Sequence, residues 1–312
     1  MADLPKRALG ILGPEVSVVG LGCNNFGRRI DVDGTRAVVD AALEQGITFL
    51  DTADIYGSPH GRSEELLGEV LKGRRDEVVL ATKFGMNMDD GRGPRGSPAY
   101  IRQAIEASLR RLRTDVIDYY WYHEPDGVTP IADTLEALDE LVRAGTVRAI
   151  GASNFSAEQI EEADAVARDR GLTRFTAVQN HYSLLVREPE REVLPTCERL
   201  GLGFVPFFPL ASGLLTGKYH RGEAAPAGTR LAERSQVATE QQFDVVEALE
   251  RYAAAREVTM IDVAIGALLA RTPVTTVIAG ATKPEQVRAN VAAGRWEPDD
   301  NDMAELEELL NR

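Results

Sequence analysis

The sequence predicts an α/β fold, a (β/α)₈ TIM barrel that forms one domain over residues 1–312. Short apolar runs rich in β-branched residues alternate with amphipathic helical stretches, and this alternation implies right-handed βαβ crossovers and a parallel sheet. Eight such units favour a closed barrel over an open sheet. The length suits one barrel, and no linker or composition shift marks a second domain.

The elements follow one another along the chain in a regular order. Before the first unit, ALGILGPEVSVVG reads as a β-hairpin that turns at Gly13-Pro14 and plugs the bottom of the barrel. The predicted strands are 18–23, 48–54, 78–84, 116–123, 147–153, 176–182, 203–209 and 274–280. The predicted helical stretches are 34–45, 63–72, 98–112, 130–143, 156–169, 190–200 and 240–270, with an appended C-terminal helix at 302–311.

The segment 211–239 is too long for an ordinary connection between a strand and a helix. It is rich in Gly, Ala and Arg. We therefore expect a mobile functional loop here.

Composition and charge exclude several classes of protein. The chain is 44% hydrophobic and 27% charged, as soluble globular proteins are, and it has no apolar run long enough to span a membrane. Its formal charge of −14 repels nucleic acid and anionic membranes, so neither is an expected partner. The start, MADLPKRALG, lacks an apolar signal core, and we expect a cytoplasmic protein.

The cysteines and histidines show no spacing for a metal site or a disulfide framework. Only Cys23 and Cys197 occur, with four scattered histidines. We expect no metal, and a reducing compartment is the simplest fit. The sequence carries no signal for an oligomeric state.

Polar side chains end nearly every predicted strand, and the segment FLDTADIYG is the most unusual of these ends. Active sites of such barrels lie at the carboxyl ends of the strands. Taken singly, Asp51 could be a turn residue, Lys83 a strand-end lysine and His123 a structural histidine. Their convergence on one rim favours an active site, which the strand ends Ser153-Asn154, Gln179-Asn180 and 280–283 would extend.

Ordered motifs along the chain carry a family resemblance. They are FLDTADIYG, the lysine of ATKFG, the histidine before EPD, GASNFS, VQNHY, LASGLLTGKY and GATKPEQVRAN. Over almost its whole length the chain resembles the aldo-keto reductases, near the long-loop bacterial branch and the potassium-channel β subunits. The resemblance implies a (β/α)₈ barrel that binds a nicotinamide cofactor.

The resemblance also implies a catalytic set of Asp51, Tyr56, Lys83 and His123. Carbonyl reduction needs a hydride from the cofactor and a proton for the oxygen. A phenol has a pKa of about 10, and an adjacent ammonium would lower it toward a working value. Tyr56 would give the proton, Lys83 would supply the positive charge, Asp51 would hold Lys83, and His123 would orient the carbonyl. Asp54 is expected to cap or brace the Tyr56 loop.

The sequence has no GxGxxG motif that follows a strand and opens a helix, so it does not indicate a Rossmann domain. The expected cofactor contacts follow from the resemblance instead. Ser153, Asn154 and Gln179 should hold the nicotinamide carboxamide. Phe207 should stack on the nicotinamide ring, although the family often has tyrosine followed by serine where this chain has Phe207-Phe208. Further expected cofactor contacts are Gly22, Cys23, Leu210, Gly213 and Lys218, of which the last three should pass under the pyrophosphate.

The end of the last unit should bind the far end of the cofactor. TKPEQVRAN begins a helix, whose free N–H groups suit a phosphate. Lys283 and Arg288 could meet a 2′-phosphate, although the arginine and lysine that many NADPH-specific relatives have at positions 286 and 280 are absent. We favour NADP(H), with NAD(H) as an alternative. The remaining expected contacts here are Gly280, Thr282, Gln286 and Asn290.

The main functional prediction is an NADP(H)-dependent reductase that acts on a small-molecule aldehyde or ketone. Two alternatives stay open: a nicotinamide-binding regulatory subunit with little turnover, and an alcohol dehydrogenase that runs the reaction in reverse. The substrate pocket should be framed by the loops 86–97 and 211–239 together with Phe26, Tyr56, Phe84 and Met86.

Overall fold

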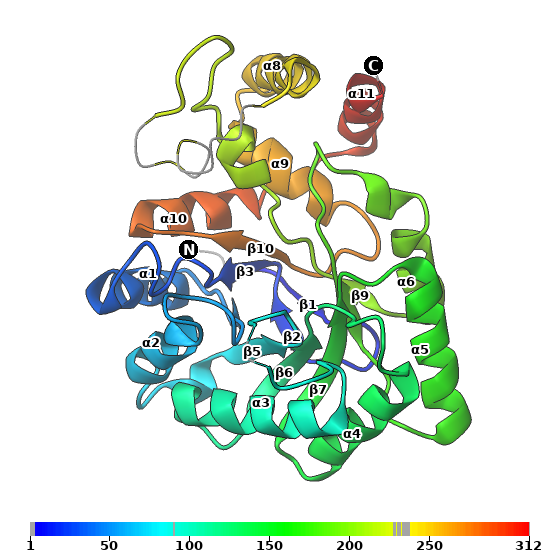
Figure 1. Cartoon of the computed structure of the whole chain (residues 1–312). Helices are drawn as coiled ribbons and strands as arrows, with labels where there is room; N and C mark the ends of the chain where they lie inside the picture. The colour runs from blue at the N-terminus through cyan, green and yellow to red at the C-terminus, as the bar shows by residue number, and fades with distance from the viewer. Residues whose placement is uncertain (1–3, 90, 227–228, 230–231, 233–237, 312) are drawn as a thin grey trace.

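The computed structural model describes residues 4–89, 91–226, 229, 232 and 238–311. Within them, eight parallel strands curl into the predicted barrel in the order β10-β3-β4-β5-β6-β7-β8-β9 (Figure 1). A bridge between Phe204 and Val274 and a 3.3 Å bond from the Ile278 amide to the Pro206 carbonyl join the two ends of the sheet. The strands are β3 Val19–Gly22, β4 Phe49–Asp51, β5 Val79–Phe84, β6 Ile117–Tyr122, β7 Val147–Ser153, β8 Ala177–Gln179, β9 Gly203–Phe204 and β10 Val277–Gly280.

Helices return the chain from each strand to the next and cover the outside of the barrel (Figure 1). Local sequence fixes several of their starts: Asp31 and Ser97 accept hydrogen bonds from amides of the first turn, and Ser156 and Gln159 form a capping box. The covering helices are α1 Val32–Glu44, α2 Arg62–Val70, α3 Pro98–Leu112, α4 Ile131–Arg143, α5 Ala157–Arg170, α6 Val193–Leu200, α9 Met260–Leu269 and α10 Pro284–Ala293. Short 3₁₀ helices lie at η1 Arg75–Glu77, η2 Glu188–Glu190 and η3 Ala211–Thr216.

The N-terminal hairpin is present, as predicted, and closes one end of the barrel. It pairs β1 Lys6–Ala8 with β2 Glu15–Ser17 in antiparallel register. Leu9 and Val16 are fully buried among the inward-facing side chains of the barrel strands. These inward-facing side chains are Phe49, Ala81, Tyr119, Trp121, Ala149, Ala177, Val205 and Ile278. The hairpin therefore fills one end of the barrel, and the strands finish at the opposite end.

The interior packs around two large rings on β6. Trp121 and Tyr119 are fully buried, with ring centroids 4.4 Å apart. Gly151 on β7 makes room for them, since a Cβ at that position would lie 2.5 Å from the Trp121 ring and 2.7 Å from that of Tyr119. The Tyr119 hydroxyl donates to the Ile150 carbonyl at 3.0 Å, which keeps this polar atom paired.

The stretch 240–270, predicted as one helical run, is two helices, and this corrects the prediction. The first is α8 Glu240–Ala255 and the second is α9. Glu257 adopts a left-handed φ of 56°, and Thr259 then starts α9 with a capping box to Asp262. The apolar periodicity continues through the break, so the pattern alone did not reveal it.

The helix α8 lies outside the ring beside the predicted C-terminal helix, α11 Asp300–Leu310 (Figure 1). The Tyr252 hydroxyl bonds Asp302 at 2.9 Å, and Arg256 forms an ion pair with the same carboxylate. None of the helices that the structure describes has the length and apolar character to cross a membrane.

Part of the predicted mobile loop at 211–239 lies outside the described residues, namely 227–228, 230–231 and 233–237. The described part begins with η3. Further along, Arg221 forms ion pairs with Glu240, Asp244 and Glu247 of α8. These contacts join the loop to the outer helix α8.

Candidate active site

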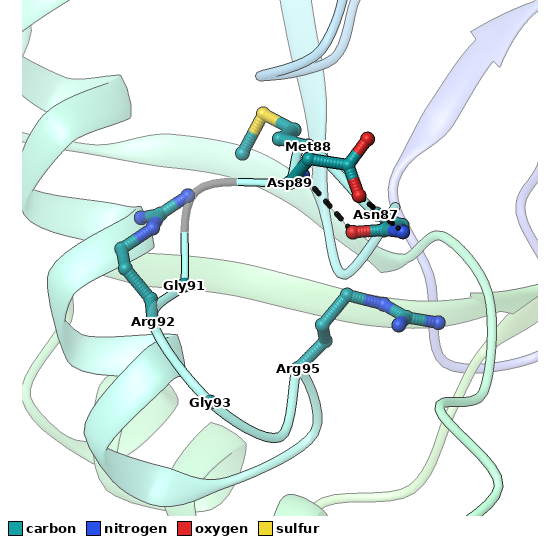
Figure 2. A pocket seen from close by; sticks show the side chains of 7 residues that line it. All are labelled: Asn87, Met88, Asp89, Gly91, Arg92, Gly93 and Arg95. Carbon is teal, nitrogen blue, oxygen red and sulfur yellow. Dashed lines mark hydrogen bonds between the residues drawn. The ribbon is translucent and has the colours of Figure 1, made fainter.

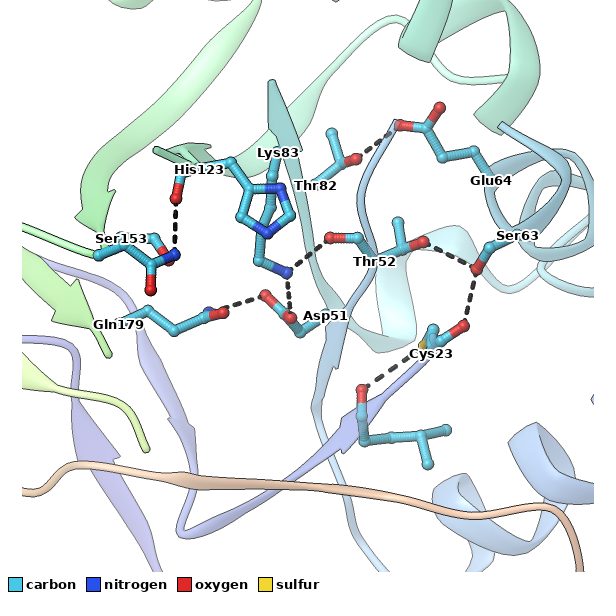
Figure 3. A network of polar contacts seen from close by, with 12 residues as sticks. Cys23, Asp51, Thr52, Ser63, Glu64, Thr82, Lys83, His123, Ser153 and Gln179 are labelled. Atoms are coloured by element: carbon cyan, nitrogen blue, oxygen red, sulfur yellow. Dashed lines mark hydrogen bonds and ion pairs between the residues drawn. The ribbon is translucent and has the colours of Figure 1, made fainter. Parts of the chain in front are cut away.

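The four residues of the predicted catalytic set lie together at the carboxyl ends of the strands, which we call the rim. Asp51 ends β4, Lys83 lies one residue before the end of β5, His123 follows β6, and Tyr56 lies in the loop after β4. Lys83 and Asp51 form a buried ion pair, and Lys83 Nζ also donates to the Thr52 carbonyl at 2.8 Å (Figure 3). Lys83 Nζ lies 5.0 Å from the centroid of the Tyr56 ring. The ring centroids of Tyr56 and His123 are 5.9 Å apart.

Strand alternation and a short turn explain this placement. Side chains of β5 alternate between the two faces, and Lys83 lies on the same face as the inward Ala81. A lysine with no exposed side-chain surface requires a partner, which Asp51 provides. The Asp54 amide donates to the Lys83 carbonyl and the Tyr56 amide to the Ala53 carbonyl, both at 3.1 Å. This turn places the Tyr56 ring beside Lys83.

Burial and charge set the protonation of these groups. Burial raises the pKa of Asp51, although Lys83 opposes the rise. Burial lowers the pKa of Lys83, but Asp51 and Tyr56 together outweigh it and leave the pKa above its ordinary value. Burial and the nearby Lys83 charge hold the pKa of His123 well below its ordinary value. At neutral pH Lys83 is therefore an ammonium and His123 a neutral imidazole with one N–H to donate.

The pKa of Tyr56 departs from expectation. Burial raises it above the ordinary value, and the opposing attraction of Lys83 does not cancel the rise. Lys83 lowers the pKa of Tyr56, as predicted, but the desolvation of the phenolate is the larger effect, so the pKa does not fall below its ordinary value. Tyr56 carries its proton throughout the neutral range.

The amide and hydroxyl groups expected at the carboxamide lie next to the catalytic set. Gln179, at the end of β8, donates from Nε2 to Asp51 Oδ1 at 3.1 Å (Figure 3). Asn154, just after β7, has a φ of 59° and donates from Nδ2 to the His123 carbonyl at 2.9 Å and to Ser153 Oγ at 3.2 Å. Its amide donates to the Gln179 carbonyl at 3.1 Å. Hydrogen bonds therefore connect the ends of β4, β5, β6, β7 and β8.

Phe207 lies on the chain after β9, half-buried, with its amide bound to the Asn180 carbonyl at 3.1 Å. His181 stacks against it, with ring centroids 5.4 Å apart and planes 13° from parallel. Phe208 stands nearly perpendicular to Phe207, at a φ of 54°. His181 was not predicted; its only sequence signal was its place in VQNHY beside two predicted polar residues.

Leu210, Gly213 and Lys218 lie together around η3. The Gly213 amide donates to the Leu210 carbonyl at 2.7 Å, and its φ of 98° requires glycine-like freedom. The Lys218 ammonium lies beside it, since a Cβ on Gly213 would be 3.0 Å from Nζ. Ser212 shares the left-handed backbone, with a φ of 58°.

The last unit places its predicted cofactor residues around the start of α10. Gln286 Oε1 accepts from the Thr282 amide at 2.7 Å and from its hydroxyl at 3.2 Å, so this side chain already caps the turn. Lys283 is the exposed N-cap residue, and Arg288 lies 4.0 Å from Glu285. Asn290 is buried within the helix.

The first and last strands of the barrel meet at two further predicted cofactor residues. Gly22 of β3 pairs with Gly280 of β10. Cys23, the next residue, is buried, and burial holds the pKa of its thiol well above the ordinary value. Its carbonyl accepts from Ser63 Oγ at 2.9 Å, and Ser63 in turn bonds Thr52 Oγ1 at 2.8 Å (Figure 3).

Two predicted substrate-pocket residues lie elsewhere, and this corrects the prediction. Phe26 and Phe84 are fully buried in the core between strands and helices. Phe84 follows the inward Lys83, so alternation turns it outward, where it stacks on Tyr122 with ring centroids 5.1 Å apart. Neither ring has surface exposed to a pocket in this structure.

Met86 is partly exposed at the start of the loop after β5. Further along this loop lies a cavity of about 350 Å³, and Figure 2 shows that one segment supplies all of its lining. The cavity is lined by Asn87, Met88, Asp89, Gly91, Arg92, Gly93 and Arg95. Arg95 Nε anchors this segment by donating to the Gly85 carbonyl at 2.6 Å.

Comparison with known proteins agrees with this arrangement. The model of the aldo/keto reductase family matches residues 18–311, which is nearly the whole chain and includes every rim residue described above. The chain therefore belongs to the aldo/keto reductase family.

Proposed function

We propose that the chain is an NADP(H)-dependent reductase of aldehydes and ketones in which Tyr56 donates the proton. Its family supports nicotinamide-dependent carbonyl reduction in general. The finer assignment is carried by one observation: a lysine with no exposed side-chain surface, paired to Asp51, lies beside the rings of Tyr56 and His123 at the open end of the barrel.

The rim residues fit a nicotinamide cofactor, which when bound would supply the hydride. Gln179 keeps Oε1 as an acceptor because only its Nε2 is engaged with Asp51. Asn154 is exposed beside it, and the half-buried Phe207 offers a flat apolar ring. These groups would hold the carboxamide and the ring, and the residues around η3 and α10 would hold the phosphates.

In the proposed reaction one proton passes from a side chain of the protein to the substrate. Tyr56 holds it on the phenol oxygen and gives it to the carbonyl oxygen of the substrate. The Lys83 ammonium then stabilises the phenolate, and Asp51 keeps Lys83 in place. His123, as neutral imidazole, donates a hydrogen bond that orients the carbonyl. In the reverse direction the same phenolate would accept the proton from an alcohol.

A panel of aldehydes and ketones tests the proposed activity. With NADPH in excess, we expect turnover in the usual enzyme range of about 1–10³ s⁻¹ with at least one carbonyl. Rates below about 10⁻² s⁻¹ with every compound, together with tight NADPH binding, would instead favour a regulatory subunit.

Replacement of Lys283 by alanine tests the preference for NADP(H). We expect the Kd for NADPH to rise by about tenfold or more and that for NADH to change little, because only NADPH carries a 2′-phosphate for the ammonium to pair with. Fluorescence titration with both cofactors measures this. Lys72, exposed after α2, gives the matched control, and Lys72→Ala should leave both constants unchanged. Equal losses for the two cofactors in Lys283→Ala would place the 2′-phosphate elsewhere.

A further inference from the structure

A buried polar group lies behind the turn that carries Tyr56. Asp54 is 3% exposed, and apart from a weak interaction with the amide of the next residue, Ile55, its carboxyl oxygens have no hydrogen-bond partner among the described residues. The buried hydroxyl of Tyr120, on the outward face of β6, has none there either. Buried polar atoms are normally paired, so two such groups near one catalytic turn call for an explanation.

The other charged groups around Asp54 are already engaged. Glu64 of α2 is fully buried and accepts from Thr82 Oγ1 at 2.5 Å (Figure 3) and from Arg111 Nε at 2.6 Å. Arg92, from the loop after β5, lies 4.4 Å from the centroid of the Tyr100 ring and donates to its hydroxyl at 3.2 Å. Among the described residues, the titratable groups that interact with Asp54 are Glu64, Arg111, Arg92 and Tyr120, and Tyr100 lies next to Arg92 and Tyr120.

The charges around Asp54 determine whether its carboxyl is ionised. Arg111 matches Glu64, whereas Asp54 has no ion pair with any described residue. An ionised Asp54 would place a second buried negative charge beside Glu64 without a counterion in contact, which is strongly unfavourable. An un-ionised carboxyl avoids that cost.

The backbone of Asp54 connects this buried group to the catalytic residues. Its amide donates to the Lys83 carbonyl at 3.1 Å. Two residues later, Tyr56 closes the turn with its amide on the Ala53 carbonyl, and its carbonyl accepts from the Ser63 amide at 3.2 Å. Any displacement of Asp54 would therefore move Tyr56 relative to Lys83.

We propose that Asp54 is a positioning residue that remains un-ionised in the working enzyme and holds the Tyr56 turn against Lys83. The kinetic part of this proposal rests on the proposed role of Tyr56; the protonation of Asp54 does not. Ionisation of Asp54 would disturb the turn and slow the proton transfer, and Tyr56 itself would still be protonated.

The two groups titrate in different pH ranges. Burial, followed by the repulsion of Glu64, raises the pKa of Asp54 to about 8, against smaller opposing effects of Arg111 and Arg92. Burial holds the pKa of Tyr56 above its ordinary value of about 10. The pKa of Asp54 is higher in the folded state than its value of about 4 in the unfolded chain. The un-ionised carboxyl therefore contributes to stability fully below about pH 4, and this contribution is lost as the pH rises to about 8.

Replacement of Asp54 by asparagine, which keeps the shape and cannot ionise, tests the kinetic part. In the wild type, kcat for carbonyl reduction should fall at least tenfold as pH rises through about 8, with the KM for NADPH nearly constant. Asp54→Asn should keep most of the activity at neutral pH and lose this alkaline decline until Tyr56 titrates. Asp33→Asn, an exposed carboxyl on α1, should retain the wild-type profile, as should Tyr120→Phe. An alkaline decline that persists in Asp54→Asn would overturn the proposal.

Infrared difference spectra test the protonation independently of activity. Wild type minus Asp54→Asn should show the C=O stretch of an un-ionised carboxylic acid at about pH 6.5 and lose it at about pH 9.5. If Asp54→Asn does not fold, the difference between the two pH values in the wild type gives the same band. No such band at the lower pH would overturn the proposal even in an active enzyme. A band in a protein without carbonyl turnover would support the state of Asp54 and count against the proposed function.

Discussion

Replacing Tyr56 with phenylalanine should lower kcat for carbonyl reduction by about 10²–10⁴-fold, the usual contribution of a general acid. The change removes one hydroxyl and leaves the ring beside Lys83 and His123, where their contacts with Tyr56 place it. The Lys83–Asp51 ion pair is untouched, and so are the Asn154 and Gln179 bonds that connect the strand ends. The Kd for NADPH should therefore stay the same.

Steady-state NADPH oxidation and a parallel fluorescence titration separate these two effects. Tyr252 of α8, which bonds Asp302 far along the chain from the rim, provides a matched control, and Tyr252→Phe should keep the full kcat. If Tyr56→Phe retains more than about a tenth of the wild-type kcat, another group donates the proton.

Replacing Lys83 with methionine should damage both catalysis and folding. The catalytic loss arises because the phenolate of Tyr56 would lose the cation that stabilises it. The loss of stability, about 3–5 kcal/mol, arises because Asp51 would remain buried without its counterion. Urea denaturation at neutral pH measures the second effect, and reductase assays measure the first.

A second substitution distinguishes the two roles of Lys83. Asp51→Asn combined with Lys83→Met removes the stranded carboxylate, so most of the lost stability should return while the reductase activity stays low. As a control, Arg102→Met breaks the ion pair between Arg102 and Glu140, whose two side chains are 54% and 62% exposed, respectively. This change should lower the free energy of unfolding by only about 0–1 kcal/mol. A double variant no more stable than Lys83→Met would show that packing around the lysine stem, rather than the charge pair, holds the rim together.

The sequence was informative where periodicity and residue chemistry agree. Strand alternation with helices predicted the barrel, the turn residues at 13–14 predicted the hairpin, and strand-end polarity brought together Asp51, Lys83 and His123. These features depend on local pattern and on a simple rule for where strands of a parallel barrel finish. Cap residues such as Ser156 depend on local sequence in the same way, since they act on the amides next to them.

Other features depend on three-dimensional contacts that a single sequence does not display. Phe84 was expected in the pocket, but it faces the outer core because Lys83 faces inward, and this parity depends on the strand register. The bond between Gln179 and Asp51 joins residues far apart in the chain. The pKa of Tyr56 depends on how much burial opposes the attraction of Lys83, a balance of two large effects that residue types alone do not give.

The rim and the cavity after β5 are held together in different ways, and this bears on how the sequence can change over generations. Hydrogen bonds and an ion pair connect five strand ends at the rim, whereas a single loop lines the cavity after β5. In that loop a side chain added at Gly91 or Gly93 would meet no atom of the described residues within 4 Å, although the left-handed backbone there favours glycine. Substitutions that respect this backbone can accumulate in the loop without stranding a buried charge. The sequence of this loop can then change while the hydrogen bonds of the rim are preserved.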